Sequence, residues 1–229
     1  MPRNFVTSIL LLFVLAAHVA AANVKIMCFG ASIVGAPGCW RASLWKKLQD
    51  NNIKNTDFVG SNKAPDCGFP YDGENEGHAG AKAADYAADG RLVGWLNAAK
   101  PDIIVMHLGT NDVLAPKTPA ETIAAYDVLI NQMRASKPSM KIIVSQLIPL
   151  DPKKFNAKQV QGIVDLNKAI VDWAPKRSSR QSPIIVVDNF TGFNTATDTI
   201  DGEHPNDAGN QKLASKFYQP VADQIKSVG

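Results

Sequence analysis

Apolar residues follow two patterns along this chain. Short runs rich in Ile and Val occur at five places, and the last three are continuously apolar. Continuous runs are typical of parallel strands that are covered on both faces. We therefore predict strands at residues 24–29, 57–59, 102–108, 141–147 and 184–187.

Between these runs, apolar residues recur every three or four positions, which is the spacing of a helix with one buried face. The segment Thr118-Pro119-Ala120-Glu121 opens one such helix with a capping box and with proline at the first helical position. The helical positions are Leu44 and Leu48; Ile123, Tyr126, Ile130 and Met133; Val160, Ile163, Leu166, Ile170 and Trp173; and Leu213, Phe217, Val221 and Ile225.

This alternation of strands and helices predicts a three-layer α/β/α sandwich with a five-stranded parallel sheet and right-handed crossovers. No internal repeat or linker divides the chain. In such sheets ligands bind at the carboxyl ends of the strands, so chemistry is expected there. The loop at residues 61–79 has prolines and glycines but no periodicity. Loops of this length are often functional.

The amino-terminal segment has the three parts of a secretory signal peptide. Arg3 precedes a nearly continuous apolar run at residues 5–17, and small residues follow at positions 20–22. A membrane anchor is the alternative, but a spanning helix needs roughly 20 apolar residues and this run is shorter. We therefore predict a signal peptide at 1–22, one domain at 23–229, secretion to the extracellular space, and no membrane attachment after cleavage.

Charge and cysteine content narrow the class of protein further. The formal net charge is +3, with basic and acidic residues interspersed, so the chain lacks the basic stripe of a nucleic-acid-binding protein. Of three cysteines, Cys28 lies in the first apolar run and is expected to be a buried thiol. Cys39 and Cys67 lie in Gly/Pro-rich loops and are the disulfide candidates. Asn189 begins a glycosylation sequon, which is usable only if its loop is exposed.

Four polar segments stand next to predicted element boundaries, and together they contain what acyl transfer needs. A serine nucleophile requires a base, a histidine base requires an acceptor that orients it, and the oxyanion requires donors. We predict Ser32 as the nucleophile, His204 at the start of the final helix as the base, and Asp201 as its orienting acceptor. The predicted oxyanion hole combines the N–H groups of Ser32 and Gly80 with the Asn111 amide.

Each of these residues alone has an ordinary structural explanation. Ser32 would cap a helix, Asn111 would be a turn residue, and Gly80 would serve backbone freedom. Asp201 would be a turn aspartate, and His204 a loop or helix-start residue. Their order and their positions after the strands, taken together, favour the catalytic interpretation.

Other histidines and tryptophans carry weaker predictions. His107 lies within a predicted strand and is expected to be a hydrogen-bonded structural residue. His78 either lines the pocket or braces its loop, and it is kept as a substrate-binding candidate. Trp40, Trp45 and Trp173 are expected in the core, with Trp40 also kept as a candidate platform for stacking a sugar. No recognised spacing links these groups into a metal site.

The four polar segments resemble those of the GDSL/SGNH hydrolase superfamily, as FGASIVG, EGHAG, GTND and DGEHPN. Within it, the chain is most similar to acetyl xylan esterases of carbohydrate esterase family 3, through residues 38–44, 57–61 and 145–150. The resemblance implies the flavodoxin-like SGNH fold and deacetylation of plant polysaccharide without a metal or organic cofactor. Ala31 stands where the family usually has aspartate, which bears on rate and fine specificity.

We therefore predict a monomeric, secreted serine esterase that removes O-acetyl groups from plant-type polysaccharide or oligosaccharide through an acyl-enzyme. One alternative is a lipid-directed esterase or lysophospholipase, although the polar loop at 61–79 argues against the apolar channel that a long acyl chain needs. The other is a non-catalytic secreted carbohydrate-binding protein on the same fold.

Overall fold

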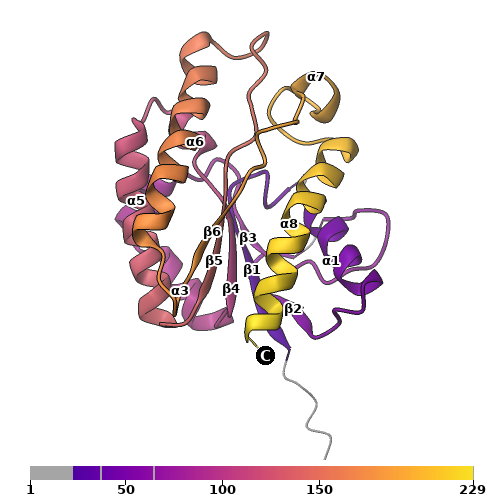
Figure 1. The fold of residues 1–229 in the computed structure, drawn as a ribbon. Coiled ribbons are helices and arrows are strands. Elements are labelled where there is room, and N and C mark those ends of the chain that lie inside the picture. The colour runs from indigo at the N-terminus through magenta and orange to yellow at the C-terminus, as the bar shows by residue number, and fades with distance from the viewer. Residues whose placement is uncertain (1–22, 37, 64, 229) are drawn as a thin grey trace, which may run out of the picture.

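A computed structural model describes residues 23–36, 38–63 and 65–228 of the chain. Its described part is an α/β/α sandwich around a parallel sheet (Figure 1). The strands run in the order β2-β1-β4-β5-β6, and β3 also pairs with β1. The strands are β1 (Val24–Gly30), β2 (Thr56–Phe58), β3 (Glu76–Gly77), β4 (Ile103–His107), β5 (Lys141–Ser145) and β6 (Ile184–Val187).

All five predicted strands are present. The strand β6 has the predicted bounds, the other four have shifted ends, and β3 is a sixth that the sequence pattern did not predict. The amino end of β1 pairs with β2 and its carboxyl end pairs with β3. Because β4 occupies the opposite edge of β1, β2 and β3 follow one another along the same edge. The two-residue strand β3 thus brings the end of the long loop beside the carboxyl end of β1.

Helices cover both faces of the sheet. In Figure 1, α1 and α8 lie on one side and α3, α5 and α6 on the other. Alternate residues of β1 point to opposite faces. Met27 and Phe29 join the core under α5 and α6, while Ile26 and Cys28 join the core under α1 and α8. The helices are α1 (Trp40–Asp50), α2 (Ala83–Asp89), α3 (Arg91–Ala99), α4 (Thr110–Leu114), α5 (Pro119–Ser136), α6 (Ala157–Arg177), α7 (Thr195–Asp198) and α8 (Asp207–Val228).

Helices α5 and α6 begin at local capping signals. Thr118 and Glu121 form the predicted capping box of α5, and Asn156 and Gln159 form a second at α6. Helix α2 has no such local signal, because its N-cap residue makes no side-chain cap. Instead the buried Asp112 carboxylate accepts hydrogen bonds from the first N–H groups of α2 across a separation of nearly thirty residues.

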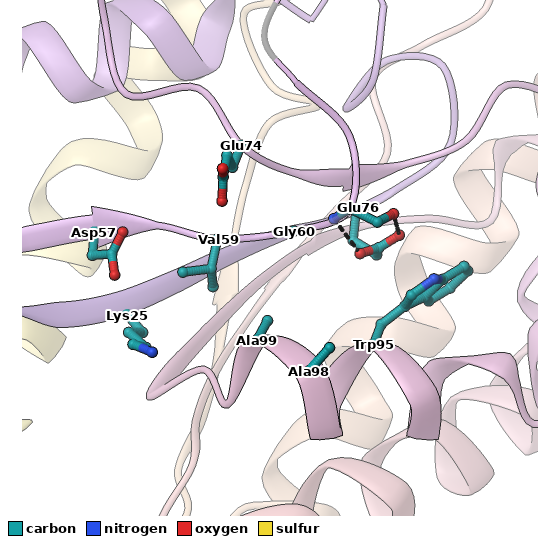
Figure 2. Close-up of a pocket in the computed structure, with 10 residues that line it drawn as sticks. Lys25, Asp57, Val59, Gly60, Glu74, Glu76, Trp95, Ala98 and Ala99 are labelled. Atoms are coloured by element: carbon teal, nitrogen blue, oxygen red, sulfur yellow. Dashed lines mark hydrogen bonds between the residues drawn. The ribbon is translucent and has the colours of Figure 1, made fainter.

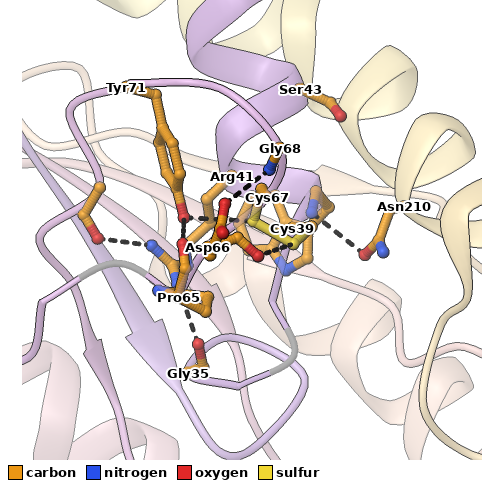
Figure 3. The surroundings of a disulfide bond; sticks show 12 residues. Gly35, Cys39, Arg41, Ser43, Pro65, Asp66, Cys67, Gly68, Tyr71 and Asn210 are labelled. Carbon is orange, nitrogen blue, oxygen red and sulfur yellow. Dashed lines mark hydrogen bonds between the residues drawn. A yellow bond between two sulfur atoms is a disulfide. The ribbon is translucent and has the colours of Figure 1, made fainter.

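A disulfide joins Cys39, immediately before α1, to Cys67 in the loop between β2 and β3 (Figure 3). This is the pair expected from the loop positions. Cys28 is a buried free thiol, and its burial raises the pKa to about 12 against the opposing effect of the Arg41 charge.

The predicted signal peptide at 1–22 lies outside the described residues. Among the residues that are described, no helix combines the length and the apolar character needed to cross a membrane.

Candidate active site

Sheet register brings the candidate segments to one edge. Gly30, at the carboxyl end of β1, pairs with Gly77 on one side and with His107 on the other. Within four positions after these three residues the chain reaches Ser32, Gly80 and Asn111. Parallel strands end at a common edge, so the three candidates emerge together.

Ser32 lies in a tight turn and not at a helix N-terminus. The Ala31 carbonyl accepts hydrogen bonds from the N–H groups of Val34 and Gly35, and α1 begins only at Trp40. The turn packs closely on β3, because a Cβ added to Gly77 would lie 2.2 Å from the Gly35 nitrogen. Glycine at position 77 is therefore required for this close approach.

The Arg41 side chain holds the turn that carries Ser32, a role that the sequence did not predict. Its guanidinium is buried and donates to the carbonyls of Val34 at 2.5 Å, Gly35 at 2.9 Å and Gly73 at 2.7 Å. Burial lowers the pKa of Arg41 below its ordinary value. Figure 3 shows this side chain between Gly35 and Tyr71. The sequence could have indicated this role, because Arg41 occupies one of the buried positions of α1.

Trp40 is not a platform for sugar, which corrects that candidate role. The side chain is fully buried and stacks on Phe217 with ring centroids 4.8 Å apart. Its indole N–H donates to the Ile33 carbonyl at 2.8 Å. Trp40 therefore anchors the residue that follows Ser32 to the core under α8.

The side chains of Ser32, His204 and Asp201 form a chain of hydrogen bonds. Ser32 Oγ lies 2.9 Å from His204 Nε2, and His204 Nδ1 lies 2.8 Å from Asp201 Oδ2. With the proton on Nδ1 donated to the carboxylate, Nε2 presents its lone pair to the serine hydroxyl. This arrangement can accept the proton of Ser32 as the hydroxyl attacks.

Asp201 is held as an ionised acceptor. Burial acts to raise its pKa, but hydrogen bonds from the His204 backbone N–H, the His204 ring and the Glu203 N–H outweigh this and lower it to about 2. Glu203 is half-buried beside the same histidine. Burial raises the pKa of Glu203, and the charge of His204 acts in the opposite direction.

His204 lies in a loop before the last helix, which corrects its predicted position at the helix start. Helix α8 begins at Asp207, and the Asn206 side chain accepts the Gly209 N–H at 3.1 Å. The loop closes on itself, because the Ile200 N–H donates to the His204 carbonyl at 2.8 Å. Hydrogen bonds within this loop, to Ile200 and Asp201, therefore hold the histidine in place.

The oxyanion candidates have donors available. In the described part of the chain, neither the Ser32 nor the Gly80 N–H donates to another backbone group. Gly80 has a φ of +74°, a left-handed conformation that favours glycine. The Asn111 amide donates to the Ala81 carbonyl at 3.1 Å, so the Asn111 side chain is linked to the segment that carries Gly80.

His78 braces its loop. Its Nε2 lies 2.6 Å from Glu76 Oε1, and its ring stacks on Trp95 with centroids 4.7 Å apart. A cleft of about 330 Å³ opens nearby, between the Ser32 turn and the segment before Gly80, and its lining includes Gly35 and Ala79. His78 is not among the residues that line this cleft.

Two further predictions need correction. His107 is buried in β4, but its Nε2 has no hydrogen-bond partner among the described residues, and burial lowers its pKa to about 4. Asn189 is only 1% exposed and donates to Ser145 Oγ at 2.7 Å. The folded protein has no room for a glycan there, because the Asn189 side chain is buried.

The described residues contain no group of three or more His, Cys, Asp or Glu side chains placed to hold a metal ion.

Comparison with known families agrees with this geometry. Residues 28–212 match the model of the GDSL-like lipase/acylhydrolase family. The chain belongs to this family. Its members are carboxylic ester hydrolases, and the three-layer fold described above is that of its solved SGNH hydrolase neighbours.

Two solved structures of this hydrolase family resemble the chain strongly. One is a carbohydrate esterase family 3 protein from Talaromyces cellulolyticus, and the other is an acetyl esterase in which one serine is mutated to alanine and an acetate ion is present. Each is 33% identical, with a TM-score of 0.82, and the match covers 90% of this chain and 100% of the other.

A multidomain esterase of Ruminococcus flavefaciens is 25% identical over 232 residues, covering 91% of this chain. The match spans only 30% of that relative, so this chain corresponds to less than a third of its length.

Proposed function

We propose that this protein is a secreted acetyl esterase that removes O-acetyl groups from plant-type polysaccharide or oligosaccharide. The hydrogen-bonded series Ser32, His204 and Asp201 carries the proposal, with distances of 2.9 Å and 2.8 Å. The likeness to an acetyl esterase and to carbohydrate esterase family 3 supports an acetylated carbohydrate as substrate.

In the first half-reaction, Ser32 Oγ attacks the acetyl carbonyl carbon while its proton passes to His204 Nε2. Asp201 stabilises the resulting imidazolium. The N–H groups of Ser32 and Gly80 and the Asn111 amide hold the oxyanion, and losing one such donor costs about 3 kcal/mol of transition-state stabilisation. The ester C–O bond then breaks, and His204 returns the proton to the departing sugar oxygen.

In the second half-reaction, His204 takes a proton from water, and the hydroxyl oxygen attacks the acetyl group on Ser32. Collapse of this second intermediate breaks the bond to Ser32 Oγ, which regains its proton from His204. Acetic acid leaves and ionises to acetate in solution, which releases one proton, while Ser32 and His204 return to their starting protonation states. No external reductant or oxidant takes part. The cleft between the Ser32 turn and Ala79 is the site that we assign to the sugar.

Replacing the nucleophile tests the mechanism. Ser32→Ala is expected to lower kcat on an aryl acetate by at least about 10³-fold, because the attacking atom is lost while the fold remains. Ser215→Ala, on the exposed side of α8, is the matched control and keeps wild-type rates. Ser32→Ala also fails to react with a fluorophosphonate. Wild-type-like turnover by Ser32→Ala contradicts the proposal, and a wild-type chain inert to the fluorophosphonate favours the non-catalytic alternative.

Acyl-chain length separates the proposal from the lipid-directed alternative. We expect kcat/KM to fall from aryl acetate to long-chain aryl esters, since the loop at 61–79 is polar and Gly/Pro-rich. Acetate release from acetylated xylan, pectin and chitin fragments then defines the polymer. A rate that rises strongly with chain length instead identifies a lipid-directed esterase.

A further inference from the structure

The Gly80 N–H belongs to a short turn whose geometry depends on residue 78. The His78 backbone N–H donates to the Gly30 carbonyl at 3.1 Å, and the His78 carbonyl accepts the Ala81 N–H at 3.1 Å. Residues 78–81 therefore connect the carboxyl end of β1, through the His78 N–H, with the Asn111 side chain, through the Ala81 carbonyl. A change in the backbone torsion angles of His78 would therefore change the direction of the Gly80 N–H.

The His78 side chain is held on two sides. One ring nitrogen contacts Glu76 at 2.6 Å, and the ring lies nearly parallel to Trp95, at 14°. Tyr86 meets the same ring edge-on, with centroids 6.4 Å apart. These partners come from β3, α3 and α2, so three elements fix one imidazole.

Glu76 itself is locked in place. Its side chain is 1% exposed and accepts the Ser61 N–H at 2.9 Å and the Ser61 hydroxyl at 2.6 Å. Figure 2 shows these two hydrogen bonds at the edge of a cleft of about 340 Å³, with Trp95 on the neighbouring helix α3. A buried carboxylate with three donors is a rigid support, because removing a donor leaves it unsatisfied.

We propose that His78 is a positioning residue for the reaction, which orients the Gly80 N–H of the oxyanion hole through its bond to Glu76 and its stack on Trp95. The inference rests on the proposed function. His78 does not touch the reacting atoms in this scheme. Its ring supports the backbone that donates to the oxyanion.

The expected effect is on the chemical step. Misplacing a catalytic group by about 1 Å can cost up to about 10²-fold in rate. Loss of a whole oxyanion donor costs about 10²- to 10³-fold in kcat. Loosening the Gly80 turn should therefore lower kcat by roughly 10- to 100-fold and leave KM almost unchanged, because the ground-state substrate does not need the donor.

Two substitutions at position 78 separate positioning from simple packing. His78→Ala removes both the stack and the bond to Glu76, and we expect the full loss in kcat. His78→Gln keeps an N–H donor near the Nε2 position, so it should restore most of the kcat. Arg134→Gln is the matched control, because Arg134 also bonds across elements, to Ser182 and the Arg177 carbonyl, and is remote from the site.

Glu76→Gln is an independent test. Glutamine has one side-chain oxygen instead of two, so it cannot accept all three hydrogen bonds, from the two Ser61 groups and from His78. We therefore expect kcat to fall, as for His78→Ala, with KM unchanged. Melting temperature and circular dichroism are measured for every variant, and kcat is compared among the variants that are folded at the assay temperature.

The outcomes separate this inference from the proposed function. Activity that depends on Ser32, together with a His78→Ala kcat within twofold of wild type, overturns the role of His78 alone. A rise in KM with kcat unchanged also overturns it, because His78 would then bind substrate. A kcat loss in Arg134→Gln equal to that in His78→Ala would assign the effect to stability. A wild-type chain without esterase activity overturns the proposed function instead.

Discussion

Asp201 accepts three hydrogen bonds, from the Glu203 N–H and from the backbone and ring of His204. The catalytic role that we propose for it depends on the ring contact. Asp201→Asn keeps an acceptor but loses the charge that stabilises an imidazolium. Because the carboxylate side chain is 51% exposed, water partly replaces it. We expect kcat to fall by roughly 10- to 10³-fold with little change in KM, measured on an aryl acetate. An unchanged kcat would assign the orienting role to another group.

The same hydrogen bonds predict how stability depends on pH. The pKa of Asp201 is lowered from 3.8 to about 2 in the folded protein. A lowered carboxyl pKa stabilises the fold above the unfolded value, and this contribution is lost as the pH falls through the folded value.

The melting temperature of wild type minus that of Asp201→Asn should therefore be constant above about pH 5 and shrink between about pH 4 and pH 2. Thermal melts across this range provide the check. A difference that stays constant down to pH 2 would show that the carboxyl has an ordinary pKa.

At the scale of elements, the loop between β2 and β3 is tied to the start of α1 by the Cys39–Cys67 disulfide, 28 residues apart in sequence. By chain entropy, a closed loop of this length contributes roughly 3–4 kcal/mol to the free energy of unfolding. We expect the double substitution Cys39→Ser, Cys67→Ser to lower the melting temperature by roughly 6–16 °C.

A reducing agent should lower the wild-type melting temperature by a similar amount and leave the double variant unchanged. We expect little change in kcat, because the hydrogen bonds between Ser61 and Glu76 still hold the loop near β3. A wild-type melt that is insensitive to reduction would contradict this account.

Helix α2 shows why some elements escape sequence analysis. Its first N–H groups are capped by Asp112, which lies after β4. Likewise β3 has two residues and exists because Gly30 and Gly77 pair. Neither element has a periodic pattern or a local start signal, since the groups that stabilise it are distant in the chain.

At the scale of the whole molecule, the described part of the two hydrophobic cores begins with Val24 in β1. We propose that residues 1–22 are a removable leader and that 23–229 is one domain. A chain of residues 23–229 should match the full chain in melting temperature and kcat/KM, because it keeps every core residue that the structure describes. A control chain that begins at residue 31 lacks β1 and should not fold. Sequencing the amino terminus of the secreted protein tests the cleavage site, and a 23–229 chain that aggregates would contradict the domain boundary.

The local pattern by itself determined the five main strands, the four long helices and the order of the polar segments. Period and capping signals act over a few residues, so the hydrogen bonds that they predict are mostly within one element. Position after a strand also pointed to Ser32, because residues at strand ends in a parallel sheet share one edge. His204 was predicted instead from the need of a serine nucleophile for a histidine base.

Tertiary structure alone decided the contacts that side chains make with distant segments of the chain. Trp40 and Asn189 have local sequences that suit a sugar platform and a glycan site, yet packing against α8 and Ser145 buries them. The support of His78 by Glu76 and Trp95, and of the Ser32 turn by Arg41, joins segments that periodicity does not relate. Burial and hydrogen bonding between distant segments arise only when the chain is folded, so they cannot be predicted from a local pattern.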